Sequence, residues 1–150
     1  MKKFVIICMF VLAALCTASC GRISEINSSE LTELLNSSSV FSERLTEIDD
    51  TAAEKRFFLN PSDYTDMTAY VGTKAVCDEF AIIKTSDPDT VMTKLRGHLD
   101  IQKNNYSSYR PAEAQKIDSA LLTEYKGTVV LVVSGSSENV VQLYENYLKK

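Results

Sequence analysis

The sequence predicts an α+β domain, with a small, mainly antiparallel four-stranded sheet and helices packed on one face, behind an N-terminal signal segment. Two segments, 64–84 and 121–133, are rich in β-branched and aromatic residues, and a glycine-containing turn lies within or at the edge of each expected strand pair. This pattern is typical of β-hairpins. The segments around them carry apolar residues at helical spacing. Because the expected strands come in pairs, an antiparallel sheet flanked by helices is favoured.

The N-terminal part of the domain is predicted less sharply. A first short helix is expected in the segment Ser-Ser-Glu-Leu-Thr-Glu-Leu-Leu (28–35), where the serines can cap the helix and the leucines share a face. Residues 40–60 stay ambiguous: their apolar side chains can pack, and the stretch 50–59 could form another helical turn or two. The Asn-Pro pair at 60–61 ends whatever element precedes it.

The first hairpin is expected to turn at Gly-Thr-Lys (72–74), between strands over about 64–71 and 75–85. A helix should begin at Ser-Asp-Pro (86–88), where a capping side chain precedes a proline in the first turn, and should end near residue 104. In the second strand of the hairpin, the apolar residues fall on both parities: Val76, Phe80 and Ile82 on one, Cys77, Ala81 and Ile83 on the other.

A second short helix is expected from Pro111, followed by a second hairpin that turns at Lys126 and Gly127. Its second strand, 128–133, is an apolar β-branched run, which indicates a central strand. A final helix should follow the serines at 136–137, with its apolar residues facing the core. One alternative stays open, in which 112–150 hold a single strand and Ser-Ala-Leu-Leu-Thr-Glu-Tyr is helical.

The first twenty residues have the three-part layout of a secretory signal. Lys2 and Lys3 precede an unbroken apolar run of twelve residues, 4–15, and small residues follow it. As a helix this run would be about 18 Å long, whereas the hydrocarbon core of a bilayer is about 30 Å thick. We therefore interpret the run as a signal peptide and not as a transmembrane anchor.

The triplet Ala18-Ser19-Cys20 resembles the lipobox of bacterial lipoproteins, although Thr17 stands where that motif usually has leucine. The resemblance implies that the Cys20 thiol carries a diacylglycerol and that cleavage occurs just before it. It places the protein at the cell membrane, lipid-anchored, on the extracytoplasmic face. The expected organisation is a signal peptide over 1–19, a lipidated cysteine and polar tether over 20–28, and a single domain over 29–150.

Composition limits the classes of function. The formal charge is −4, and loss of residues 1–19 would remove two lysines and leave −6. Nucleic-acid binding depends on a basic face and is not expected. Cys77 would be the one cysteine left beside Cys20. We therefore expect no disulfide, no metal site and no cofactor in the domain.

Two adjacent carboxylates, Asp78 and Glu79, are the most conspicuous candidates for chemistry. Neighbouring residues of a strand point to opposite faces, so the two are not expected to converge as a catalytic pair must. We expect one in solvent and one paired with a lysine or a backbone N–H. His98, the single histidine, is expected at the surface or boundary of its helix, and no nucleophile accompanies it. An enzyme is therefore not predicted.

Three residues near an expected loop, Tyr106, Tyr109 and Arg110, form the best candidate for an exposed ligand or partner surface, to which Asp78 and Glu79 could contribute. Exposed aromatic side chains beside a guanidinium group are common in recognition surfaces.

Three segments, 76–82, 109–113 and 127–131, read Val-Cys-Asp-Glu-Phe-Ala-Ile, Tyr-Arg-Pro-Ala-Glu and Gly-Thr-Val-Val-Leu. In this order and spacing they resemble a family known as domain of unknown function 4358, predicted lipoproteins of Gram-positive anaerobic bacteria. The resemblance spans about residues 65–147. It implies the lipid anchor and the fold, and it brings no activity with it.

The function expected from the sequence is that of a surface lipoprotein with a non-enzymatic accessory or interaction domain. Its partners would be the membrane, through the lipid, and another protein. The alternative is a small-ligand-binding lipoprotein of an uptake or sensing system. A deep pocket with converging polar groups would favour that alternative.

Overall fold

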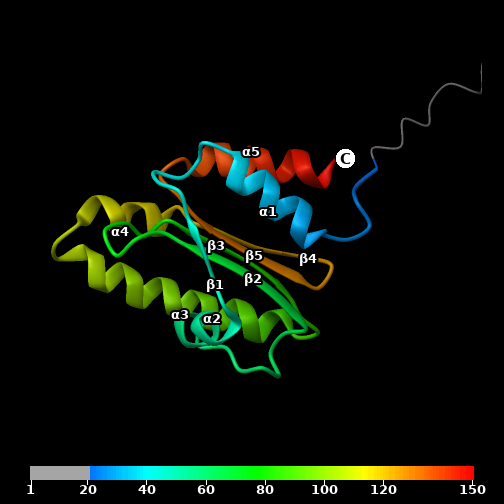
Figure 1. The fold of residues 1–150 in the computed structure, drawn as a ribbon, viewed down its shortest axis with the longest axis horizontal. Coiled ribbons are helices and arrows are strands. Elements are labelled where there is room, and N and C mark those ends of the chain that lie inside the picture. Colours follow the sequence, from blue (N-terminus) through cyan, green and yellow to red (C-terminus); the bar gives the residue numbers. More distant parts are fainter. Residues whose placement is uncertain (1–20) are drawn as a thin grey trace, which may run out of the picture.

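The computed structural model describes residues 21–150, and the expected signal peptide and lipobox lie outside them. The described chain forms an α+β domain in which a five-stranded sheet lies between two layers of helices (Figure 1). In chain order the elements are α1 (Ser28–Ser37), β1 (Thr46–Ile48), α2 (Asp50–Phe57), β2 (Asp66–Val71), β3 (Glu79–Lys84), α3 (Pro88–Ser107), α4 (Pro111–Asp118), β4 (Leu121–Tyr125), β5 (Thr128–Val133) and α5 (Ser137–Leu148).

The sheet is antiparallel throughout, with strand order β1-β2-β3-β5-β4. The β2–β3 and β4–β5 pairs are the two expected hairpins, and all six residues of β5 are buried, as expected of a central strand. The fifth strand, β1, comes from the ambiguous stretch 40–60 and pairs with β2, where Glu47 lies opposite Tyr70. The expected count of four strands was therefore one too low.

Helices cover both faces of the sheet, so the expectation of helices on one face was wrong. The layer of α2, α3 and α4 packs on Ala81, Ile83 and Leu131. The layer of α1 and α5 packs on Phe80 and Ile82 from the opposite side. Because the two central strands carry apolar side chains at both parities, each face must be shielded from water.

Helix starts follow local capping rules. The Asn27 side chain, one residue before the expected serines, accepts a hydrogen bond from the Glu30 N–H at 3.1 Å. Asp87 caps α3 by accepting from the Thr90 N–H at 3.1 Å, and Pro88 occupies the first turn as predicted. The helix α3 continues to Ser107, beyond the expected end near residue 104.

The first described residues join the domain almost at once. The Ile23 N–H donates to the Leu148 carbonyl at 3.1 Å, and the Tyr125 hydroxyl donates to the Ile23 carbonyl at 2.8 Å. Ile26 is fully buried. Within the described residues, contacts with the domain therefore begin at Ile23, inside the stretch 20–28 that was expected to be a polar tether. The β4–β5 turn and the C-terminal end of α5 lie beside this entry point (Figure 1).

The β4–β5 turn depends on a glycine. Lys126 and Gly127 both have positive φ, 49° and 81°, as a two-residue hairpin turn of type I′ requires. A Cβ added at Gly127 would also lie 3.2 Å from the Thr85 carbonyl oxygen.

Replacing Gly127 with Ala is expected to lower the free energy of unfolding by about 1–2 kcal/mol, because alanine is strained at this φ. Urea unfolding followed by circular dichroism measures the change. The matched control is Gly97→Ala in the interior of α3, where an added Cβ meets nothing within 4 Å. That variant should gain about 0.5–1 kcal/mol from helix propensity. Equal effects of the two substitutions would contradict this account of the turn.

Candidate functional site

The segment that links β2 to β3, residues 72–78, lies at one end of the sheet and is held by the α3–α4 region. The Tyr106 hydroxyl donates to the Val76 carbonyl at 2.9 Å, and Arg110 Nη1 donates to the Ala75 carbonyl at 2.8 Å. The Glu113 carboxylate accepts a hydrogen bond from the Cys77 N–H at 2.9 Å. This segment, which we call the β2–β3 loop, is therefore fixed by side chains of two helices, although it lacks regular structure.

Asp78, at the end of the loop, is buried and fully paired. One carboxylate oxygen accepts hydrogen bonds from the Ser42 N–H and from the Ser42 hydroxyl, both at 2.6 Å. The other lies 2.9 Å from Lys116 Nζ of α4, and the same ammonium lies 3.0 Å from Glu113. Burial lowers the pKa of Lys116, but the two carboxylates outweigh it and raise that pKa above its ordinary value.

Glu79, the first residue of β3, is also buried and has a separate set of partners. One oxygen lies 2.6 Å from Arg56 Nε of α2, and the other lies 2.6 Å from His98 Nε2 of α3. Burial raises the pKa of Glu79, but His98 and Arg56 outweigh it and hold that pKa below its usual range. The Phe57 ring packs edge-on against the His98 ring, with centroids 5.0 Å apart.

Two expectations about these groups were wrong. Neither Asp78 nor Glu79 lies in solvent, since each is 1% exposed, and His98 is buried and not at the surface. The physical reason is that a cation from a helix reaches each carboxylate, so both charges can be buried without being left unpaired. The two carboxylates do not converge on a common site, as their adjacent positions on a strand predicted.

A cluster of potential metal ligands, Cys77, Asp78 and Glu113, lies within the same region, with ligand atoms within 4.8 Å of one another. Lys116 Nζ is bonded to both carboxylates of this cluster and supplies the positive charge there. Burial raises the pKa of the Cys77 thiol, whereas metal binding needs the thiolate. The cluster is therefore an internal ion-pair network of the protein.

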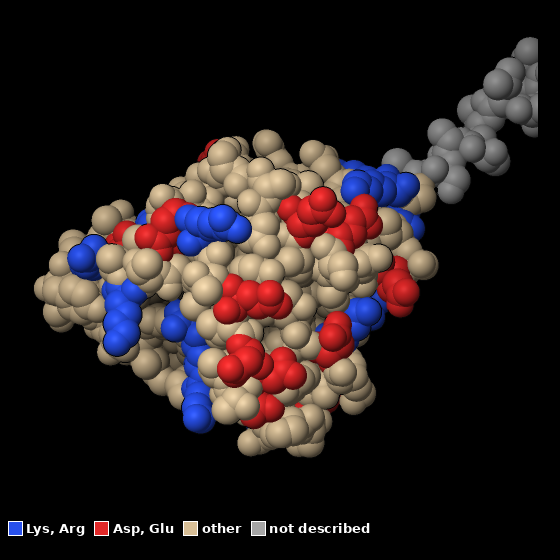
Figure 2. All heavy atoms as spheres, in the orientation of Figure 1, with Lys and Arg blue, Asp and Glu red and all other residues tan. Residues whose placement is uncertain are grey.

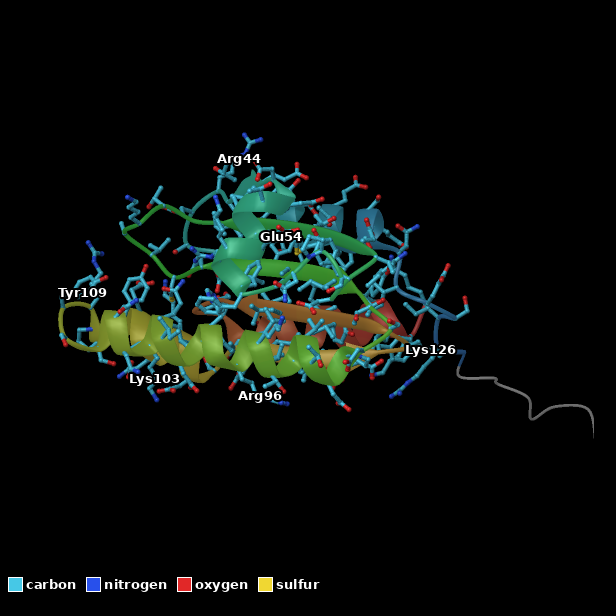
Figure 3. The ribbon with its side chains drawn as sticks, turned by 90° about the horizontal axis from the view of Figure 1, so that it is seen from below. Arg44, Glu54, Arg96, Lys103, Tyr109 and Lys126 are labelled. Carbon is cyan, nitrogen blue, oxygen red and sulfur yellow. The ribbon has the colours of Figure 1, made fainter. Side chains whose placement is uncertain are left out.

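The candidate surface residues are divided between core and solvent. Tyr106 is 6% exposed and belongs to the core, whereas Tyr109 is 62% exposed with its ring 5.7 Å from that of Tyr106. Arg110 is exposed and lies against the β2–β3 loop. Figure 3 shows Tyr109 at the far end of the domain from Lys126, which lies in the β4–β5 turn.

A hollow of about 280 Å³ opens between the β2–β3 loop, the end of α2 and the second half of α3. We call it the loop hollow. The sequence did not point to its two cationic residues, Arg56 and Lys74. Its other lining residues include Thr73, Gln102, Asn105 and Tyr109.

A larger hollow of about 540 Å³ lies between the end of α1 and β2. Its two charged residues, Glu43 and Arg44, have opposite signs. The Glu43 carboxylate accepts a hydrogen bond from the Thr73 N–H. Phe41 and Tyr70 belong to its apolar lining, and the ring of each stacks on the buried Phe80. This hollow therefore lacks the excess of positive charge among its lining residues that the loop hollow has.

Among the helices of residues 21–150, none combines the length and the apolar composition of a membrane span.

Comparison with known proteins gives a family and no activity. No curated protein and no solved structure matches the chain. A family model described as a domain of unknown function (DUF4358) matches residues 38–134, from the end of α1 through β5. The match begins earlier and ends earlier than the resemblance seen in the sequence, since it includes β1 and α2 and leaves out α5. The chain belongs to the DUF4358 family.

Proposed function

We propose that the chain is an extracytoplasmic lipoprotein whose domain serves a non-enzymatic accessory or interaction role at the cell membrane. The observation that carries the proposal is the short connection between Cys20 and the fold. Ile23 is already bonded to α5 and to β4, so three residue steps separate the expected lipid from a fixed point. Three extended residues reach about 10 Å. A diacylglycerol on Cys20 would hold the β4–β5 turn close to the membrane, since two acyl chains give a stable anchor.

The opposite end of the domain would then face away from the membrane. It contains the β2–β3 loop, the α3–α4 connection and the exposed ring of Tyr109 (Figure 3). A protein partner in the extracytoplasmic space would meet this end first. Tyrosine and arginine, here Tyr109 and Arg110, are the residue types enriched in protein interfaces.

A non-enzymatic role is supported by the state of the buried ionisable groups. Asp78 and Glu79 are each shielded from solvent and paired with a cation. His98 is occupied by Glu79 and buried beside Phe57. A catalytic acid or base must reach its substrate, and these groups serve the stability of the fold.

The anchor is tested by replacing Cys20 with Ala and following membrane fractionation and the intact mass of the mature protein. Wild-type protein should sediment with membranes and carry the mass of a diacylglycerol on an N-terminal Cys20. The variant should be released or should stay unprocessed, because the acceptor thiol is gone. The matched control, Cys16→Ala, should behave as wild type. Membrane retention of the Cys20 variant with an unchanged mature mass would contradict the proposal.

A second candidate function is a small-ligand-binding lipoprotein of an uptake or sensing system. The loop hollow favours it, because the cationic residues Arg56 and Lys74 line it beside the exposed residue Tyr109.

A further inference from the structure

The loop hollow carries positive charge in an acidic protein. Arg56 and Lys74 line it, and among the described residues that line it none is acidic. The whole chain has a formal charge of −4. Figure 2 shows Lys and Arg atoms at both ends of this face, including the end where Figure 1 places α4, and Asp and Glu atoms mainly across its middle. A local excess of positive charge against the net charge of the chain indicates a site for an anion.

The guanidinium group of Arg56 is held in a fixed orientation by an ion pair within the domain. Its Nε is bonded to Glu79 at 2.6 Å, and Glu79 is in turn held by His98. Within residues 21–150 no hydrogen bond uses either terminal nitrogen of Arg56. The side chain is 31% exposed. The buried carboxylate therefore fixes the guanidinium group, and its two terminal NH₂ groups stay available for a second, bidentate partner.

Lys74 adds a second positive group from the β2–β3 loop. It is exposed, and in the described part of the chain its Nζ takes part in no hydrogen bond or ion pair. The loop itself is fixed at Ala75, Val76 and Cys77 by the contacts with Arg110, Tyr106 and Glu113. The one carboxylate that binds the outer part of the loop, Glu43, accepts the Thr73 N–H and does not line the hollow.

Tyr109 supplies an aromatic wall. The residue is 62% exposed, and its ring lies against the buried Tyr106 ring, with centroids 5.7 Å apart. Gln102 and Asn105 of α3 add amide groups that can donate or accept hydrogen bonds. Such a combination of one flat apolar face and a few polar groups is typical of small-molecule sites.

We propose that the loop hollow binds a small organic anion, whose carboxylate or phosphate group is held by Arg56 and Lys74 while its ring or apolar part lies against Tyr109. The volume of about 280 Å³ limits the ligand to a small molecule. This proposal adds to the proposed accessory role a class of ligand that the domain would bind. The site is built from residues of the domain alone, so it does not depend on the lipid anchor.

The test uses the purified full-length chain in mild non-ionic detergent, followed by ¹H–¹⁵N NMR during titration with benzoate and with phenyl phosphate. Benzamide, the neutral counterpart of benzoate, is the control probe. We expect either anion to give saturable shifts at the amides of Lys74, Gln102 and Asn105, and benzamide to give none. Added NaCl should weaken the binding, because the contact with Lys74 is exposed to solvent.

The deciding variant is Lys74→Gln, which removes an exposed charge that has no partner in the described chain and should leave the fold intact. It should raise the dissociation constant for the bound probe about fivefold. The matched control is Arg96→Gln, which removes one exposed positive charge from α3 outside the hollow. Figure 3 shows Arg96 along the outer side of α3, distant from Tyr109.

A second variant, Tyr109→Ala, should also weaken binding of either aromatic probe, because it removes the ring against which the probe's own ring would lie. The fold should tolerate this change, since Tyr109 is exposed. Three results would overturn the proposal: no saturable shift with either anion, equal affinity for benzamide, or equal losses in the Lys74 and Arg96 variants. None of them would bear on the anchor, which the mass and the fractionation of the Cys20 variant test separately.

Discussion

Replacing Glu79 with Gln is expected to lower the free energy of unfolding by about 3 kcal/mol, because the change leaves Arg56 and His98 around a buried side chain that has lost its charge. The carboxylate is 1% exposed and bonded to both partners at 2.6 Å. Urea unfolding at pH 7, followed by circular dichroism, measures the loss. The matched control is Glu47→Gln on β1, an exposed glutamate bonded to the Tyr70 hydroxyl at 3.1 Å. The control should lose no more than about 0.5 kcal/mol.

The dependence on pH gives a second measure of the same interaction. The pKa of Glu79 is held below the ordinary value of a glutamate, 4.5, in the folded protein, because His98 and Arg56 outweigh the effect of burial. The charged carboxylate therefore contributes stability above the unfolded pKa, and this contribution is lost as the pH falls through the folded pKa. The difference in stability between wild type and Glu79→Gln should shrink below about pH 4.5. A difference that stays constant down to pH 3, or no difference at pH 7, would contradict the assignment.

Replacing Lys116 with Met is expected to lower the free energy of unfolding by about 2–3 kcal/mol, because Asp78 and Glu113 would lose the cation that lies between them. Lys116 Nζ lies 2.9 Å from Asp78 and 3.0 Å from Glu113, and its side chain is 17% exposed. Methionine keeps much of the apolar length, so the loss reports mainly on charge. The same unfolding assay measures it.

The control for this variant is Lys103→Met, whose ion pair with Asp118 is solvent-exposed on both sides. It should cost no more than about 0.5 kcal/mol. The double variant Asp78→Asn with Lys116→Met gives the decisive comparison. Because the two residues are in contact, their single losses should not add, and the coupling should be at least about 1 kcal/mol. Simple addition of the two losses would refute a direct interaction.

The sequence contains the main signals for the sheet. The apolar residues on both parities of 79–84 and 128–133 predicted buried strands. Strands of that kind are covered on both faces, so the same pattern also indicates helices on each side of the sheet. The short strand β1 has only three residues, Thr-Glu-Ile, so no alternation could reveal it. It exists because the edge of β2 offers backbone partners, which is a tertiary effect.

The candidate site was less accessible to prediction, because its contacts join distant parts of the chain. Glu79 meets Arg56 and His98 across 23 and 19 residues, and Asp78 meets Lys116 across 38. No local spacing encodes such pairs. The one local signal was Glu113 with Lys116, three positions apart on a helix. Tyr109 and Arg110 were singled out from the sequence, whereas Arg56 and Lys74 needed the fold to bring α2 and the β2–β3 loop together.

The most direct test of the proposed function is labelling of single introduced cysteines in intact cells with a membrane-impermeant maleimide. The positions are Tyr109→Cys at one end of the domain and Lys126→Cys at the other (Figure 3). The native Cys77 gives little background, because its thiol is buried and its pKa is raised. The proposed function predicts fast labelling at 109 without cell lysis and slower labelling at 126, which would lie next to the membrane. Labelling at either position only after lysis would contradict an extracytoplasmic, lipid-anchored domain.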